Sequence, residues 1–164
     1  MHSLVRRYLK TGIAFLALGL GLGAWMMVER ELLQRFPSRY LVSAHTHAIL
    51  VGFVMMMILG VAYHVIPRFT GHPLHSRRLA GVQWWLANIG LVLFVAGLAL
   101  LPATTYAMPA RIVVAAGGLL SGLAAYTFVY NMWRTIDGPA RRRTDTSEVT
   151  ASTEVTALRR RVAR

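Results

Sequence analysis

Four long stretches without a charged residue divide the chain, at residues 11–28, 40–67, 79–101 and 112–133. A helix crosses the hydrocarbon core of a bilayer with about 20 residues at about 1.5 Å each, so every stretch is long enough or nearly so. The period-2 alternation of a transmembrane β-barrel is not visible. The pattern predicts an all-α, membrane-embedded protein with spans near residues 11–34, 39–67, 79–101 and 109–134.

Prolines mark the ends of the predicted spans, at positions 37, 67, 102 and 109. Proline removes a backbone donor and disfavours the helical conformation in the residue before it. The connections between the spans are short, so helices that follow one another in the chain are expected to be antiparallel. Residues 1–137 are therefore predicted to form one up-down four-helix bundle.

Both ends of the chain differ in composition from the spans. Residues 138–164 are rich in Arg, Thr, Ser, Ala and Val and contain no aromatic residue, which predicts a disordered basic tail. Its arginine clusters could adsorb to anionic lipid headgroups, or the tail could simply be solvated. The first span follows a basic lead but is longer than the apolar core of about 7–15 residues in a signal peptide, so it is interpreted as a retained helix.

The net charge is +12, and the positions of the basic residues along the chain indicate the topology. On a soluble protein this charge would suggest nucleic-acid binding, but here the arginines cluster at one set of span ends. They lie before the first span, between the second and third, and after the fourth: Arg6, Arg7, Arg68, Arg77, Arg78, Arg134 and Arg141–Arg143, with Lys10. The positive-inside rule then places both termini in the cytoplasm of a bacterial-type inner membrane, and lipid rather than nucleic acid is the expected partner.

The residue types available for chemistry are few. The chain has no cysteine, which removes disulfides, thiolate-held iron–sulfur clusters and covalently attached c-type haem. The four uncharged stretches contain no carboxylate side chain. Histidine therefore remains as the principal candidate metal ligand.

Two histidines lie near the predicted outer start of the second span. His45 is six residues past Arg39, about 9 Å along a helix axis, whereas His64 is a further 19 residues away, on the opposite side of the bilayer. Ionisable residues inside a span are functional candidates by default. His45 and His47 are about 200° apart around an undistorted helix, so one metal cannot take both. One is expected to face the bundle interior and the other a neighbour, lipid or the interface.

The α-helical face that carries His45 also carries Gly52 and Met56. A glycine two turns below a ligand leaves room for a flat macrocycle beside the backbone, which makes His45, Gly52 and Met56 a candidate cofactor site. The alternative is close helix packing, which small residues permit in membranes. The same two interpretations apply to Gly19-x-x-x-Gly23 and Gly118-x-x-x-Gly122, within the bundle or between protomers.

The second span resembles a known family. The run His45-Thr46, followed by an apolar stretch that ends in Tyr63-x-x-Ile66-Pro67-Arg68, is similar to the second helix of the haem-copper oxidase catalytic subunit, the superfamily of cytochrome c oxidase subunit I and the nitric oxide reductase large subunit. The resemblance is closest to the nitric oxide reductase and high-affinity oxidase branches. It implies that His45 is an axial ligand of the iron in a low-spin haem b (heme b), which passes electrons near the outer face.

The chain also departs from this family. The copper ligands, the high-spin haem ligand and the second low-spin ligand of the family are histidines on later helices, and residues 79–134 contain no histidine. The chain alone is therefore not expected to reduce oxygen or nitric oxide, and whether it is an enzyme stays open. Many relatives carry an amide where this chain has His47, which is a candidate second ligand or a residue that adjusts the site.

Three functions are consistent with these residues: a haem b electron-transfer protein, a non-catalytic subunit or assembly partner of a respiratory chain complex, and a haem-based NO or O₂ sensor. A second axial ligand could come from His45 or His47 of a second copy in a homodimer, or from an outer thioether of Met26, Met27 or Met108. A two-fold dimer is attractive because isologous interfaces place identical residues opposite each other. Arg39 and Arg111, at the outer ends, are candidate partners for haem propionates.

Overall fold

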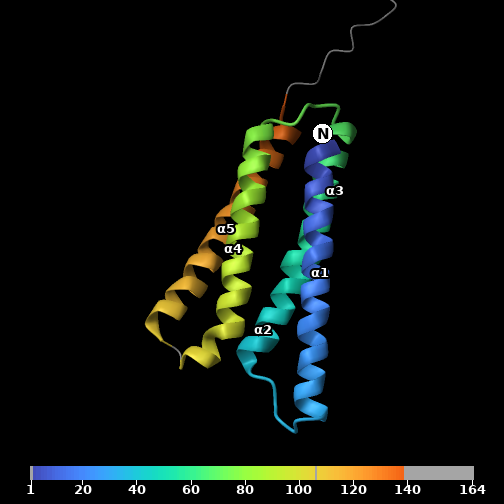
Figure 1. Cartoon of the computed structure of the whole chain (residues 1–164). Coiled ribbons are helices and arrows are strands. Elements are labelled where there is room, and N and C mark those ends of the chain that lie inside the picture. Colours follow the sequence, from blue (N-terminus) through green and yellow to red (C-terminus); the bar gives the residue numbers. More distant parts are fainter. Residues whose placement is uncertain (1, 106, 139–164) are drawn as a thin grey trace, which may run out of the picture.

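The computed structural model describes residues 2–105 and 107–138, so the predicted disordered tail lies almost wholly outside the described residues. The described part consists of helices and short connections (Figure 1): α1 (His2–Glu31), α2 (Arg39–His47), the π-helix η1 (Ala48–Met55), α3 (Met56–Phe69), α4 (Arg77–Leu100), the 3₁₀ turn η2 (Leu101–Thr104) and α5 (Met108–Ile136). Helices α2, η1 and α3 continue one another, so the described part of the chain has four helices long and apolar enough to cross a membrane. The predicted all-α four-helix architecture is confirmed.

Two antiparallel pairs make up the bundle. The first pair is α1 with the second span, which consists of α2, η1 and α3. The second pair is α4 with α5. The two pairs pack together chiefly through α2 on α4 and α3 on α5. In Figure 1 the connection after α1 lies at one end of the bundle, and the connection between α3 and α4 lies at the other. We call these the His45 end and the loop end. Helix α1 begins at His2, because the basic lead before the first predicted span is also helical.

Glycines bring α1 close to the second span. A Cβ added at Gly19 would lie 2.3 Å from the side chain of Ile49, and one added at Gly60 would lie 2.8 Å from Tyr8. Such distances are far below van der Waals contact, so a larger residue at either position would force Ile49 or Tyr8 to move, and glycine lets the two helices approach closely without that shift. The Gly19-x-x-x-Gly23 pattern therefore serves packing within the bundle.

The contact between α4 and α5 is closer still and involves backbone atoms. A Cβ at Gly117 would lie 2.5 Å from the backbone nitrogen of Phe94 and 2.7 Å from the carbonyl oxygen of Gly90. By contrast, a Cβ at Gly122 would meet nothing within 4 Å. The residues that matter here are Gly90 and Gly117, and the second glycine of the Gly118-x-x-x-Gly122 pattern has no close neighbour.

A π-helix interrupts the second span where the sequence predicts an undistorted α-helix. It occupies Ala48–Met55, directly after the two histidines. Each π turn holds an extra residue, because its hydrogen bonds run from i to i+5. The face that contacts α1 therefore shifts along the sequence: Met57, not Met56, contacts Gly12 of α1, where Met57 Sδ would lie 3.3 Å from an added Cβ.

Side-chain hydrogen bonds fix the loop end. The amide of Asn131 on α5 accepts from the backbone nitrogen of Ser76 at 3.0 Å and donates to the Ser76 carbonyl at 2.9 Å. The backbone nitrogen of His75 donates to the Thr135 hydroxyl at 3.1 Å. Because Ser76 also caps the start of α4 by accepting from Leu79, these bonds hold the α3–α4 connection against the end of α5.

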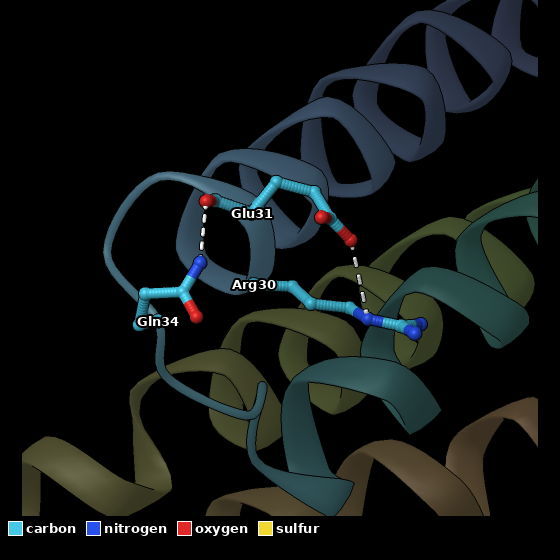
Figure 2. A network of polar contacts seen from close by, with 3 residues as sticks. All are labelled: Arg30, Glu31 and Gln34. Atoms are coloured by element: carbon cyan, nitrogen blue, oxygen red, sulfur yellow. Dashed lines mark hydrogen bonds and ion pairs between the residues drawn. The ribbon is translucent and has the colours of Figure 1, made fainter.

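Polar contacts where α1 ends, among Arg30, Glu31 and Gln34, are exposed (Figure 2). Arg30 and Glu31 form an ion pair at 3.3 Å, with about two thirds of each side chain exposed. Gln34 adopts a left-handed backbone, with φ of 51°, and its side-chain amide donates to the Glu31 carbonyl at 2.8 Å. The hydrogen bond satisfies a carbonyl at the end of α1, whereas an exposed ion pair of this kind contributes little stability.

Candidate functional site

His45 is held between the second span and α1. Its Nδ1 lies 2.8 Å from the carbonyl oxygen of Gly19, and its ring packs on Gly23, where an added Cβ would lie 3.1 Å from Cε1. A carbonyl oxygen can only accept, so Nδ1 carries the proton of this hydrogen bond, and in the neutral imidazole Nε2 then keeps its lone pair. Histidine ligands of metals are typically oriented in this way, by a hydrogen bond from the other ring nitrogen to a carbonyl or carboxylate. The ring is half-buried.

His47 faces the other way, as the angular argument predicts. Its Nδ1 lies 2.8 Å from the carbonyl oxygen of Ser43, one turn back on the same helix. Its ring meets that of Phe94 on α4 edge to face, with the ring centroids 4.7 Å apart. His45 therefore contacts α1 and His47 contacts α4, and the structure does not bring the two rings together.

Gly52 and Met56 lie in different surroundings. Gly52 faces α1, but the Phe15 side chain occupies the space beside it, at 2.5 Å from an added Cβ. Met56 is buried and lines a groove between η1, α3, α4 and α5. The extra residue in the π-helix thus removes Met56 from the face that carries His45. A macrocycle beside Gly52 requires the Phe15 side chain to rotate.

Two arginines predicted as propionate partners are exposed at the His45 end. Arg39, the first residue of α2, donates to the Tyr40 hydroxyl at 3.1 Å and places its guanidinium 5.0 Å from the centre of that ring. Arg111 lies in the first turn of α5 with its side chain exposed. Both guanidinium groups are at the same end of the bundle as His45, and their roles stay predictions.

A buried polar cluster was missed by the sequence analysis. The side-chain oxygen of Gln83 on α4 accepts hydrogen bonds from the hydroxyls of Tyr8 on α1 and Tyr63 on α3, and all three side chains are fully buried. The Tyr8 hydroxyl also lies 3.3 Å from the carbonyl oxygen of Ala80. A polar amide inside an apolar span was the available signal, because such residues hydrogen-bond across membrane helices. The cluster connects three of the four spans.

The histidines near the loop end do not form a metal site with other side chains. His72 uses Nδ1 to contact the carbonyl oxygens of Thr135 and Ile136, at 3.2 and 3.0 Å. Across residues 2–105 and 107–138, no three His, Cys, Asp or Glu side chains are grouped so that they could hold a metal ion.

Comparison with known families identifies the chain. The family described as "Cytochrome C and Quinol oxidase polypeptide I" matches residues 7–139, which is most of the sequence. The chain belongs to this family. The resemblance around His45 therefore extends over all four spans, and the chain is a multi-pass membrane protein of the oxidase polypeptide I family.

Two relatives show how much of an oxidase polypeptide I the chain spans. It is 24% identical over 155 residues to the Cbb3-type cytochrome c oxidase subunit CcoN1 of Stutzerimonas stutzeri, a match that covers 80% of this chain and 32% of that protein. It is 26% identical over 115 residues to cytochrome c oxidase subunit 1 of Rhodobacter capsulatus, covering 56% of this chain and 22% of that protein. The chain thus spans about a third or less of the length of these relatives.

Proposed function

We propose that this oxidase-family chain binds haem b through Nε2 of His45 and passes electrons near the outer face of the membrane. One observation carries the proposal: the hydrogen bond from Nδ1 of His45 to the Gly19 carbonyl fixes the tautomer and leaves Nε2 able to bind iron. Membership of the oxidase polypeptide I family supports the same assignment.

The residues around His45 fit a haem ligand in part. When bound, haem would supply a one-electron couple, whose potential depends on the axial ligands and on burial. His45 would hold the iron, and Arg39 and Arg111, with planar guanidinium groups, would pair with carboxylates at the same end of the bundle. His47 is turned toward Phe94 and cannot reach the same iron as His45. A second axial ligand would therefore come from His45 or His47 of a second copy in a two-fold dimer, or from an outer thioether of Met26, Met27 or Met108.

The test is a reduced-minus-oxidised absorption spectrum of detergent-purified protein made with ample haem. The wild type is expected to show haem b bands, and His45→Ala is expected to lose them. His47→Ala is the matched control, because it removes an imidazole two residues away and is expected to keep the bands. Colourless wild-type protein, or His45→Ala with unchanged bands, would contradict the proposal.

The surface of α5 favours a second function. In this function the chain is a non-catalytic subunit or assembly partner of a respiratory complex. Much of this helix is exposed, and its large apolar side chains include Leu119 at 77%, Tyr126 at 76% and Trp133 at 67%. Exposed apolar surface on a membrane helix can contact lipid or another subunit. This function predicts colourless protein that copurifies with other oxidase subunits.

The spectrum also separates electron transfer from gas sensing. A haem with two axial ligands on the iron excludes an added gas, whereas a five-coordinate haem binds it. Carbon monoxide added to the reduced protein is therefore expected to leave the spectrum unchanged. A shift of the bands would indicate an open coordination position and would favour NO or O₂ sensing.

A further inference from the structure

A groove between α1 and α3 at the loop end combines a basic side chain with an apolar lining. It encloses about 360 Å³ and is lined by Val5, Arg6, Leu9, Val61 and His64. Val61 is 50% exposed, and Arg6 is also exposed. Because α1 and the second span are both long enough to cross a membrane, this groove opens toward the lipid. We call it the Arg6 groove; it lies at the opposite end of the bundle from His45 (Figure 1) and takes no part in the proposed function.

The register of α1 on α3 places the polar lining residues nearer the loop end than the apolar ones. A Cβ added at Gly60 would lie 2.8 Å from Tyr8, so these two residues lie level with each other. Counted from this contact, Arg6 and His64 lie two and four residues nearer the loop end, about 3 and 6 Å along the helix axes. Val61 lies only one residue from the contact. The Arg6 groove is therefore polar toward the loop end and apolar toward the membrane interior.

Both polar side chains lie near the level of lipid headgroups. Arg6 lies five residues before the uncharged stretch 11–28, and His64 lies three residues before the end of the uncharged stretch 40–67. These positions are close to the edge of the hydrocarbon core, where the headgroup region begins. An acyl chain whose headgroup lies at this level would extend past Val61 toward the membrane interior.

The charge around the Arg6 groove is almost entirely positive. The other basic residues that the structure describes at the loop end are Arg7, Lys10, Arg68, Arg77, Arg78 and Arg134. Within residues 2–105 and 107–138, Asp137 is the one carboxylate at this end, and the guanidinium of Arg6 forms no ion pair with a described carboxylate. A guanidinium pairs with phosphate through two parallel N–H···O bonds. The charges therefore favour an anionic partner.

We infer that the Arg6 groove binds an anionic phospholipid, with the phosphate at Arg6 and His64 and the start of one acyl chain along Leu9 and Val61. Basic pockets between membrane helices bind the headgroups of anionic lipids. A zwitterionic headgroup would bring its cationic part against the arginines of the loop end, so an anionic headgroup is preferred. A volume of about 360 Å³ is near the lower end for small-molecule sites, which fits a phosphate and the first part of one chain rather than a whole lipid.

Native mass spectrometry of the purified full chain in detergent tests the inference. The probes are dioleoylphosphatidylglycerol and dioleoylphosphatidylcholine, which have the same acyl chains but headgroups of different charge. We expect one phosphatidylglycerol molecule to bind more tightly than phosphatidylcholine. Because a charge-assisted hydrogen bond is lost, Arg6→Gln is expected to weaken the binding of phosphatidylglycerol about 10-fold or more.

Arg7→Gln is the matched control for the loss of charge. Arg7 is the next residue in the sequence, but its guanidinium carbon lies 6.0 Å from the centre of the Trp84 ring on α4, and it does not line the Arg6 groove. Removing one basic residue near a lipid surface weakens the attraction of anionic lipid about 5-fold at most. Equal weakening in the two variants would show that the lipid is attracted by net charge alone, and would overturn the inference.

A second pair of variants tests the apolar part of the Arg6 groove. Val61→Phe fills the groove and is expected to weaken the binding of phosphatidylglycerol. Val82→Phe makes the same change on α4, outside the groove and at a valine that is also 50% exposed, and is expected to bind normally. The soluble headgroup sn-glycerol 3-phosphate, which has no acyl chain, is expected not to displace the lipid. Unchanged binding in Val61→Phe, displacement by glycerol phosphate, or equally tight binding of phosphatidylcholine would overturn the inference.

Discussion

At the scale of single residues, the orientation of His45 depends on Gly23. The ring packs so closely on this glycine that a methyl group there would lie 3.1 Å from Cε1. Gly23→Ala is therefore expected to move the ring away from the Gly19 carbonyl. Loss of an orienting contact of this kind typically weakens metal binding at least about 10-fold. Haem retained after titration with a competing apo-haemoprotein measures the change.

Gly21→Ala provides the control for this prediction. It lies two residues away on the same helix, and an added Cβ would meet nothing within 4 Å. Because alanine favours a helix over glycine by about 1 kcal/mol, this variant should fold at least as well as the wild type. Equal haem retention in the two variants would show that the position of the His45 ring does not control binding.

Sequence reasoning succeeded for residues whose position depends on helix rotation alone. The opposite directions of His45 and His47 follow from their spacing, and the structure has them contacting α1 and α4. The position of Met56 did not follow, because the π-helix lies between it and His45. The Gln83 cluster was also missed, since its partners come from two other spans.

At the scale of helices, the packing of α4 on α5 depends on glycine. Gly117→Ala would place a methyl group against backbone atoms of α4, which cannot move as a flexible side chain can. Overpacking typically costs about 1–3 kcal/mol. The free energy of unfolding in mixed micelles should fall by about this amount for Gly117→Ala. For Gly122→Ala, whose added methyl group has free space, it should stay the same or rise slightly.

The order and type of the helices were predictable, whereas their internal irregularity was not. Four uncharged stretches between prolines give four helices, because length and hydropathy alone decide whether a segment crosses a membrane. The π-helix has no comparable residue signal: Ala48–Met55 contains residues that an α-helix in lipid accepts equally well. For the 3₁₀ turn at Leu101–Thr104, Pro102 was the one sequence signal, since it predicts the end of a helix but not the type of turn.

At the scale of the whole molecule, the orientation in the membrane is a prediction from arginine positions. Phe36 and Phe69 are 89% and 88% exposed and lie at opposite ends of the bundle, and the chain has no native cysteine. A membrane-impermeant maleimide applied to intact cells should therefore label Phe36→Cys and leave Phe69→Cys unmodified. Permeabilised cells should label both. The reverse pattern in intact cells would put the termini, and the loop end, outside.

The uneven distribution of hydrogen bonds between helices has a consequence for how the protein matures. Asn131, Gln83 and their partners join separate helices toward the loop end, whereas the described contacts around His45 are mostly apolar. Apolar contacts can separate and re-form in lipid without leaving a polar group unpaired. At the opposite end, parting α1 from α2 would break the hydrogen bond from His45 to the Gly19 carbonyl, together with apolar contacts. The scaffold can therefore assemble first, and under the proposed function haem would enter afterwards by replacing these few contacts. Biogenesis would then need no unfolding step between membrane insertion and cofactor loading.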